Sequence, residues 1–169
     1  MVAFLLCGLA FAQQSIEFPS TNEINDLLRK ADEKVSAHEK VIKNAKPYLE
    51  RIGSKVSSND LDAAADAHTL IKGMLTGGAS AYGLVALVAT LDDLSLNAAR
   101  GTTDLLRLEI KEPSEELGGL LLLLSSSATE CNDISELLLH STLRFISAEE
   151  TILAKLTASR QDSAQPAPH

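Results

Sequence analysis

The sequence predicts an all-α fold, an antiparallel up-down bundle of three or four long helices with coiled-coil-like seams. Apolar residues recur at alternating spacings of three and four along most of the 169-residue chain, and no segment alternates with a period of two. The apolar residues are mainly Leu and Ala, with no Trp and only 4% aromatic residues, which favours close-packed helices over a β-sandwich. Short connections between long helices require neighbouring helices to run antiparallel.

The chain begins with an apolar run that ends at Ala10-Phe11-Ala12, the pattern of a secretory signal peptide and its cleavage site. The positively charged segment that usually precedes such a run is missing, which leaves the true start codon open. An apolar turn packed on the core and a membrane anchor are the alternatives. We expect residues 1–12 to be a signal peptide and residues 13–19 a linker. Cleavage would remove Cys7 and leave Cys131 as a small core residue.

The first helix is predicted over residues 21–52. Ser20 with Glu23 three residues later forms a capping-box pattern directly before a periodic run. Pro47 removes one backbone donor and predicts a kink or a break near Lys46. The apolar seam of this helix comprises Ile24, Leu28, Ala31, Val35, His38, Ile42, Ala45, Leu49, Ile52 and Val56.

A second helical segment is predicted over residues 59–111, with the polar cluster at residues 57–60 offering its N-terminal caps. Glycines weaken helix interiors, so we expect a break near Gly77-Gly78 or near Gly101. The seam comprises Leu61, Ala64, His68, Ile71, Leu75, Gly78, Tyr82, Val85, Ala89, Leu96 and Ala99.

The last helix is predicted over residues 114–160, after a boundary at Glu112-Pro113-Ser114 where proline suits the first helical turn. We expect a single bundle domain over residues 20–160 and a disordered tail over residues 161–169. The apolar residues of the last helix include Leu117, Leu120 to Leu124, Ala128, Cys131, Ile134, Leu138, Phe145, Ile152 and Leu156.

The charge distribution argues against a nucleic-acid-binding surface. The net charge is −8 and the pI is about 4.9, whereas affinity for nucleic acids comes mainly from clustered Lys and Arg. Residues 20–56 carry eight Lys or Arg against six Asp or Glu, and residues 60–160 carry seven against fifteen. This asymmetry predicts a basic first helix lying beside more acidic ones.

The segment Gly73–Leu91 contains no charged residue and approaches the length of a membrane span. Its first half, Thr76–Gly83, consists of small and polar residues, and inserting these into lipid is less favourable than burying them in a bundle. We therefore expect a buried helix here and regard membrane association as the less favoured alternative.

No catalytic signature is found in the sequence. Ser125–Ser127 lack the strand-turn-helix context of a nucleophilic serine. Asp92-Asp93 and Glu149-Glu150 are adjacent pairs, and adjacent helical residues do not face one another. The spacing of His, Cys and Glu matches no haem or zinc motif. We expect His140 to be exposed and His169 to lie in the tail.

His38 and His68 are the remaining candidates for a cofactor site, because both fall on apolar seams. If the chain turns near Gly53, the two rings share a layer and could ligate haem or a metal ion. If it turns nearer Ser57, they miss each other by about 12 Å. The simpler interpretation is a partly buried histidine that hydrogen-bonds a neighbour, or a polar seam residue that fixes register.

The sequence thus favours an exported, periplasmic or secreted protein of the bacterial cell envelope. Its role is expected to be structural or one of protein interaction, with a protein partner or self-association and without enzymatic activity, cofactor or metal. The first alternative is a haem- or metal-binding bundle that uses His38 and His68. The second is a membrane-associated helical protein that uses residues 73–91.

Overall fold

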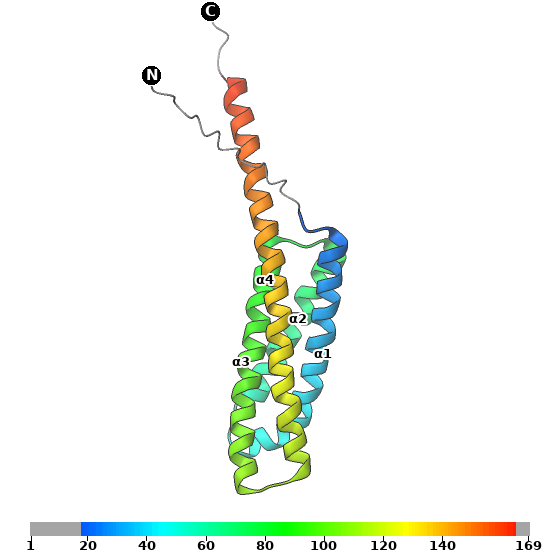
Figure 1. The fold of residues 1–169 in the computed structure, drawn as a ribbon, viewed down its shortest axis with the longest axis vertical. Coiled ribbons are helices and arrows are strands. Elements are labelled where there is room, and N and C mark those ends of the chain that lie inside the picture. The colour runs from blue at the N-terminus through cyan, green and yellow to red at the C-terminus, as the bar shows by residue number, and fades with distance from the viewer. Residues whose placement is uncertain (1–17, 165–169) are drawn as a thin grey trace, which may run out of the picture.

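The computed structural model describes residues 18–164 and shows a four-helix bundle. The helices are α1 (Thr21–Arg51), α2 (Val56–Gly77), α3 (Ala81–Lys111) and α4 (Glu115–Ala164), and they run alternately up and down (Figure 1). Each helix packs mainly against two neighbours, and no strand occurs between residues 18 and 164. The predicted fold class is confirmed. The predicted signal peptide, most of the linker and residues 165–169 lie outside the described residues.

Helix α1 follows its prediction closely. The Ser20 hydroxyl oxygen accepts a hydrogen bond from the Glu23 backbone N–H at 3.1 Å, which caps the helix. The helix does not break at Pro47, because this residue is exposed and the carbonyl that loses its partner can bind water. It ends before Gly53, which has φ 72°. Eight predicted seam residues are buried, namely Ile24, Leu28, Ala31, Val35, His38, Ile42, Ala45 and Leu49.

The start of α2 differs from the prediction. The helix begins at Val56, so the polar cluster at residues 57–60 lies inside it instead of capping it. The turn between α1 and α2 is closed before residue 57, because the Ser54 N–H donates a hydrogen bond to the Leu49 carbonyl at 2.9 Å. Helix α2 can therefore begin at Val56. The inward face of α2 repeats at spacings of three and four and comprises Ser57, Asp60, Ala64, Ala67, Ile71 and Met74.

The break between α2 and α3 lies at the predicted double glycine. Gly78 has φ 91°, and the Ser80 hydroxyl oxygen accepts the Gly83 N–H at 3.1 Å to cap α3. The predicted alternative at Gly101 is wrong, because α3 continues through it. A Cβ at position 101 would lie 3.0 Å from Cδ2 of Leu124, so this glycine allows α3 and α4 to approach closely.

The predicted seam of α3 is also wrong. Tyr82, Val85, Ala89, Leu96 and Ala99 are exposed. The three non-helical residues between α2 and α3 change the phase of the helix, so a seam extrapolated from α2 lands on the outer face. The buried face comprises Gly83, Leu84, Leu87, Val88, Leu91, Leu94, Ala98, Gly101, Leu105 and Leu108.

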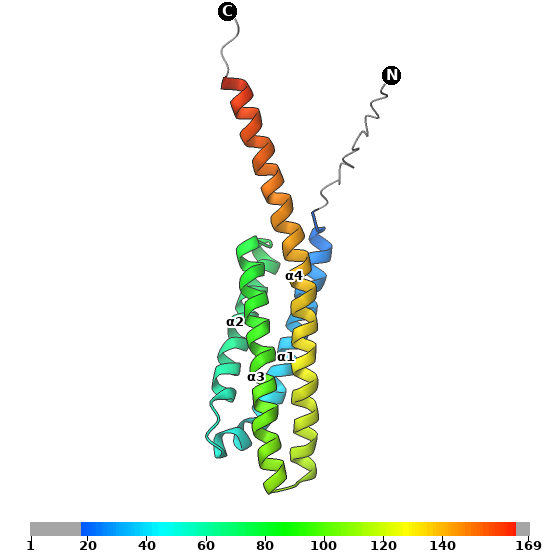
Figure 2. The same ribbon diagram turned by 60° about the vertical axis from the view of Figure 1, so that its left-hand side comes forward.

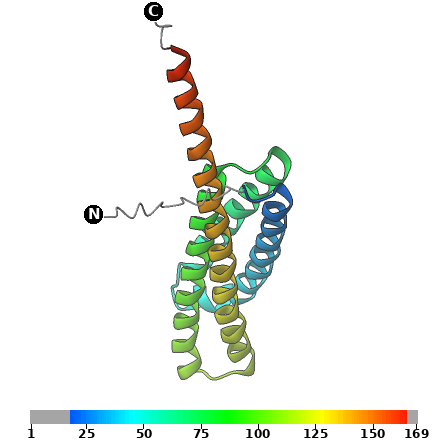
Figure 3. The same cartoon turned by 45° about the horizontal axis from the view of Figure 1, so that its top comes forward.

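Helix α4 extends well past the rest of the bundle (Figures 1, 2 and 3). The bundle closes near an edge-to-face contact between Phe18 and Phe145, whose ring centroids are 5.6 Å apart. We call residues 149–164 the α4 extension. The prediction of a disordered tail from residue 161 is wrong for residues 161–164, which are helical.

The uncharged segment Gly73–Leu91 is divided between two helices. Residues 73–77 end α2, and the larger apolar side chains of its second half, Leu84, Leu87 and Leu91, are buried inside the bundle. Among residues 18–164, no helix is long and apolar enough to cross a membrane.

Ion pairs link α1 to the acidic second half of the chain. The Lys34 ammonium donates to Glu130 of α4 at 2.8 Å, and Arg51 pairs with Glu112 at 2.7 Å. The hydrogen bond and the charge attraction between Lys34 and Glu130 raise the pKa of Lys34 and lower the pKa of Glu130. The predicted pairing of a basic first helix with acidic neighbours is found at these two places, whereas Glu23 of α1 pairs with Arg144 of α4 in the opposite sense.

Candidate functional site

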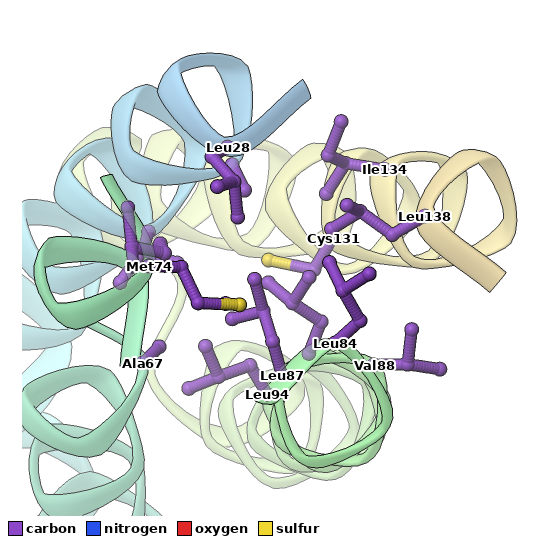
Figure 4. Close-up of a cluster of buried hydrophobic side chains, with 14 of the residues drawn as sticks. Leu28, Ala67, Met74, Leu84, Leu87, Val88, Leu94, Cys131, Ile134 and Leu138 are labelled. Carbon is purple, nitrogen blue, oxygen red and sulfur yellow. The ribbon is translucent and has the colours of Figure 1, made fainter. Parts of the chain in front are cut away.

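The core of the bundle consists of two apolar clusters. The first lies in the half where α1 begins, and Figure 4 shows side chains from all four helices converging in it. The second lies in the half where α4 begins and includes Ile42, Leu105 and Leu124. Along α1 the first cluster ends at Val35 and the second begins at Ile42, and His38 occupies the seam position between them.

His38 joins three helices through a buried polar layer, which we define as His38, Asp60 and Ser127. Nδ1 of His38 lies 2.7 Å from Oγ of Ser127 on α4, and Nε2 lies 3.2 Å from Oδ2 of Asp60 on α2. The side chains of His38 and Asp60 are 0% exposed. Each residue sits on the inward face of its helix, so the layer follows from the same spacing that builds the core.

The hydrogen bonds of the layer have one consistent assignment when Asp60 is ionised and His38 is neutral. Nε2–H then donates to Oδ2 of Asp60, and the Ser127 hydroxyl donates to Nδ1. The other carboxylate oxygen, Oδ1 of Asp60, has no hydrogen-bond partner among the described residues. Buried polar atoms are nearly always paired, so this oxygen is a local energetic weakness of the core.

The polar layer contains the residue types of a Ser-His-Asp triad in the same connectivity, with the imidazole between a hydroxyl and a carboxylate. A nucleophilic serine must reach a substrate carbonyl, but Ser127 is only 7% exposed and points into the bundle. We interpret the layer as structural. It links α1, α2 and α4 with polar contacts that only one register of these helices satisfies.

Cys131 lies one helical turn beyond Ser127 and is the only cysteine among the described residues. Its side chain belongs to the first apolar cluster, as the sequence predicted (Figure 4). Burial raises the pKa of the thiol to about 12, and a hydrogen bond with Ser127 opposes this shift. The thiol therefore stays protonated at physiological pH and is a poor nucleophile.

We expect Cys131 to react with iodoacetamide about a thousandfold more slowly in the folded protein than in urea at pH 8.5, because a raised pKa leaves little thiolate. The chain should carry Cys7→Ser so that a single thiol is followed by mass spectrometry. A native rate within about tenfold of the denatured rate would contradict the burial of this thiol.

His38 and His68 do not meet. His68 is 32% exposed in its side chain; its Nδ1 lies 2.8 Å from Asp32 and its Nε2 lies 3.5 Å from Glu39. The chain turns at residues 52–55, around Gly53 as in the first predicted case, yet His38 faces Asp60 on α2 and not His68. His68 lies eight residues beyond Asp60, about 12 Å along α2, so the two rings do not share a layer. The geometric basis for a shared bis-histidine site is therefore absent.

Other residues considered from the sequence lie apart from the polar layer. Ser125, Ser126, Glu149 and Glu150 are exposed, and His140 is exposed as predicted. His169 lies outside the described residues. Within residues 18–164, no group of three or more His, Cys, Asp or Glu side chains is placed to hold a metal ion.

Two members of the polar layer were missed by sequence reasoning. The sequence places Asp60 among the predicted helix caps and Ser127 in a serine run without a catalytic context. A signal was available for both, because Asp60 lies four residues before the buried Ala64 and Ser127 lies three residues after the buried Leu124.

Exposed apolar side chains are found at several places on the described residues, and two stretches of them continue a helical seam. The first is the α4 extension, where Ile152, Leu153 and Leu156 are exposed. The second runs along the outer face of α3, and we call it the α3 outer stripe; it comprises Tyr82, Val85, Ala89, Asp92, Leu96, Ala99, Thr103, Leu106 and Ile110. Large exposed apolar patches are typical of interaction surfaces.

Comparisons of this chain with family models, with curated proteins and with solved structures found no match.

Proposed function

We propose that the protein is an exported, non-enzymatic helical bundle that binds another protein through the α4 extension. The observation that carries this proposal is the continuation of a core seam beyond the core. Cys131, Ile134 and Leu138 of α4 are buried in the first apolar cluster. The same face continues to Ile152 and Leu156, which are 46% and 57% exposed because α1 and α3 do not reach them.

The chemistry of the α4 extension indicates what would bind it. Burying an aliphatic side chain completely stabilises a complex by about 1.5–3 kcal/mol, and three such side chains are exposed here. The extension carries Glu149 and Glu150 near its start and Lys155 and Arg160 nearer its end. A partner helix with an apolar face and the opposite order of charges would complete the seam.

The proposal of export rests on residues 1–12 of the sequence. The chain should be expressed in a bacterium, fractionated, and its N-terminal residue determined. Recovery in the periplasm or medium with Gln13 as the first residue is the expected result. Cytoplasmic protein that retains Met1 would contradict export without affecting the binding proposal.

Binding should be tested by placing a photo-crosslinking residue at Leu153 of the full chain in cells of the source organism. We expect one heterologous adduct of defined mass, and no such adduct from Lys40, an exposed position on the polar outer face of α1. Ile152→Glu with Leu156→Glu should abolish the adduct. Leu122→Glu, a matched exposed leucine on the same helix, should leave it unchanged.

The same experiment distinguishes a different protein from the other candidates that could bind the α4 extension, namely a second copy of the chain and its own N-terminal segment. An adduct between two copies, or an internal crosslink that disappears when residues 1–12 are deleted, would contradict a heterologous partner. An adduct that survives the Ile152→Glu and Leu156→Glu substitutions would show that the apolar seam is not the binding surface.

A further inference from the structure

The α3 outer stripe repeats like a second coiled-coil seam. Its members follow one another at spacings of three and four from Tyr82 to Ile110, which is four heptads and about 42 Å of helix. The large members are exposed, with Tyr82 at 84%, Leu96 and Leu106 at 49% and Ile110 at 73%. A stripe this long and regular exceeds what scattered surface hydrophobic residues produce.

The corresponding outer face of α1 provides an internal comparison. α1 has the same length as α3 and also contributes one face to the core. Its exposed positions at the same alternating spacing are almost all polar, namely Asp26, Lys30, Glu33, Ala37, Lys40 and Asn44. The outer face of α1 is therefore polar where that of α3 is apolar. Exposed leucines also occur on α4, at Leu122, Leu123, Leu137, Leu139 and Leu143.

We propose that two copies of the chain associate through their α3 outer stripes as antiparallel helices, about a two-fold axis between Leu96 and Ala99. This proposal is independent of the α4 extension and of its partner. A two-fold axis at this place sets large side chains against small ones across the interface. Leu96 of each copy faces Ala99 of the other, and Leu106 faces Ala89 of the other.

The charges beside the stripe favour this arrangement. Asp93, Arg100 and Arg107 lie seven residues apart along one flank of the stripe, and all three are exposed. In the antiparallel arrangement, Asp93 of each copy lies near Arg100 of the other, so the pair forms twice. In a parallel arrangement this flank of one copy would face the opposite flank of the other, so Asp93 and Arg100 would not meet. The order of charges along this flank of α3 thus favours a second copy in the antiparallel orientation.

The first test is sedimentation of the full chain across a concentration series. We expect a species of twice the 18.0 kDa chain mass at high concentration. Leu96→Glu with Leu106→Glu should weaken dimerisation about 30-fold or more, since it buries charges at the centre of the interface. The thermal unfolding transition should persist, because both side chains point away from the core. Ala37→Glu on the outer face of α1 is the matched control and should leave the mass distribution unchanged.

The second test uses charge exchange to establish orientation. Asp93→Arg and Arg100→Asp should each weaken the homodimer about twofold to fivefold, as expected for exposed ion pairs. Mixing these two single variants should restore association, because each then presents a uniform charge that complements the other. The double variant in one chain should also associate.

Three results would overturn the proposal. The first is a monomer at every concentration, including the case in which this face binds a different protein. The second is a dimer that persists in the Leu96→Glu and Leu106→Glu chain. The third is a dimer whose two charge variants do not rescue each other on mixing.

Discussion

Replacing His38 by alanine is expected to lower the free energy of unfolding by about 3–5 kcal/mol at pH 7, although the residue contacts no ligand. The substitution removes the hydrogen-bond partner of Asp60, whose side chain is 0% exposed and whose Oδ1 is already unpaired. It also removes the hydrogen bond between His38 and the Ser127 hydroxyl and opens a cavity between the two apolar clusters. Urea unfolding followed by circular dichroism measures the change.

An apolar replacement of the whole layer provides the control. His38→Leu, Asp60→Leu and Ser127→Ala together remove every buried polar group of the layer, so we expect stability near or above that of the original chain. A loss below about 1 kcal/mol for His38→Ala would contradict the geometry of the layer. If the apolar variant unfolds as easily as His38→Ala, the unpaired carboxylate is not the main cause of the loss.

The positions of α1 and of the break at Gly78 could be predicted because local signals agree there. Ser20 supplies a cap, one apolar face is continuous, and the opposite face of α1 is polar. In α3 the sequence presents two apolar faces with the same spacing, and periodicity alone does not say which one is buried. The break at residues 78–80 changes the phase, so continuation of the α2 seam selected the outer face.

The polar layer could be predicted only in part for a related reason. His38 was recognisable because an imidazole interrupts an aliphatic seam. Its partners depend on how α1 and α2 are paired, and that pairing is set by a turn only four residues long between Arg51 and Val56. The chain does turn near Gly53, one of the two predicted positions, but equal spacing from Gly53 pairs His38 with His68, whereas the structure pairs it with Asp60. A shift of a few residues along two antiparallel helices exchanges every facing pair.

Leu124→Ala is expected to cost about 3–5 kcal/mol, because this side chain is fully buried at the contact of α3 and α4. Its effect should depend on position 101. Gly101→Ala alone gains about 1 kcal/mol of helix propensity, but the new Cβ would lie 3.0 Å from Cδ2 of Leu124 and 3.3 Å from Cγ1 of Val56. Crowding therefore offsets the gain. In the Leu124→Ala chain the closest of these atoms is gone, so Gly101→Ala should recover about 1 kcal/mol or more.

A double-mutant cycle measured by urea unfolding tests this coupling, with an expected interaction energy of at least about 0.5 kcal/mol. Gly73→Ala is the matched control, because Gly73 lies inside α2 and a Cβ there meets nothing within 4 Å. It should stabilise the original chain and the Leu124→Ala chain equally, by about 0.5–1 kcal/mol. If Gly101→Ala changes the free energy of unfolding equally in the original chain and in the Leu124→Ala chain, as expected for Gly73→Ala, the close approach of α3 and α4 is not the reason for glycine at position 101.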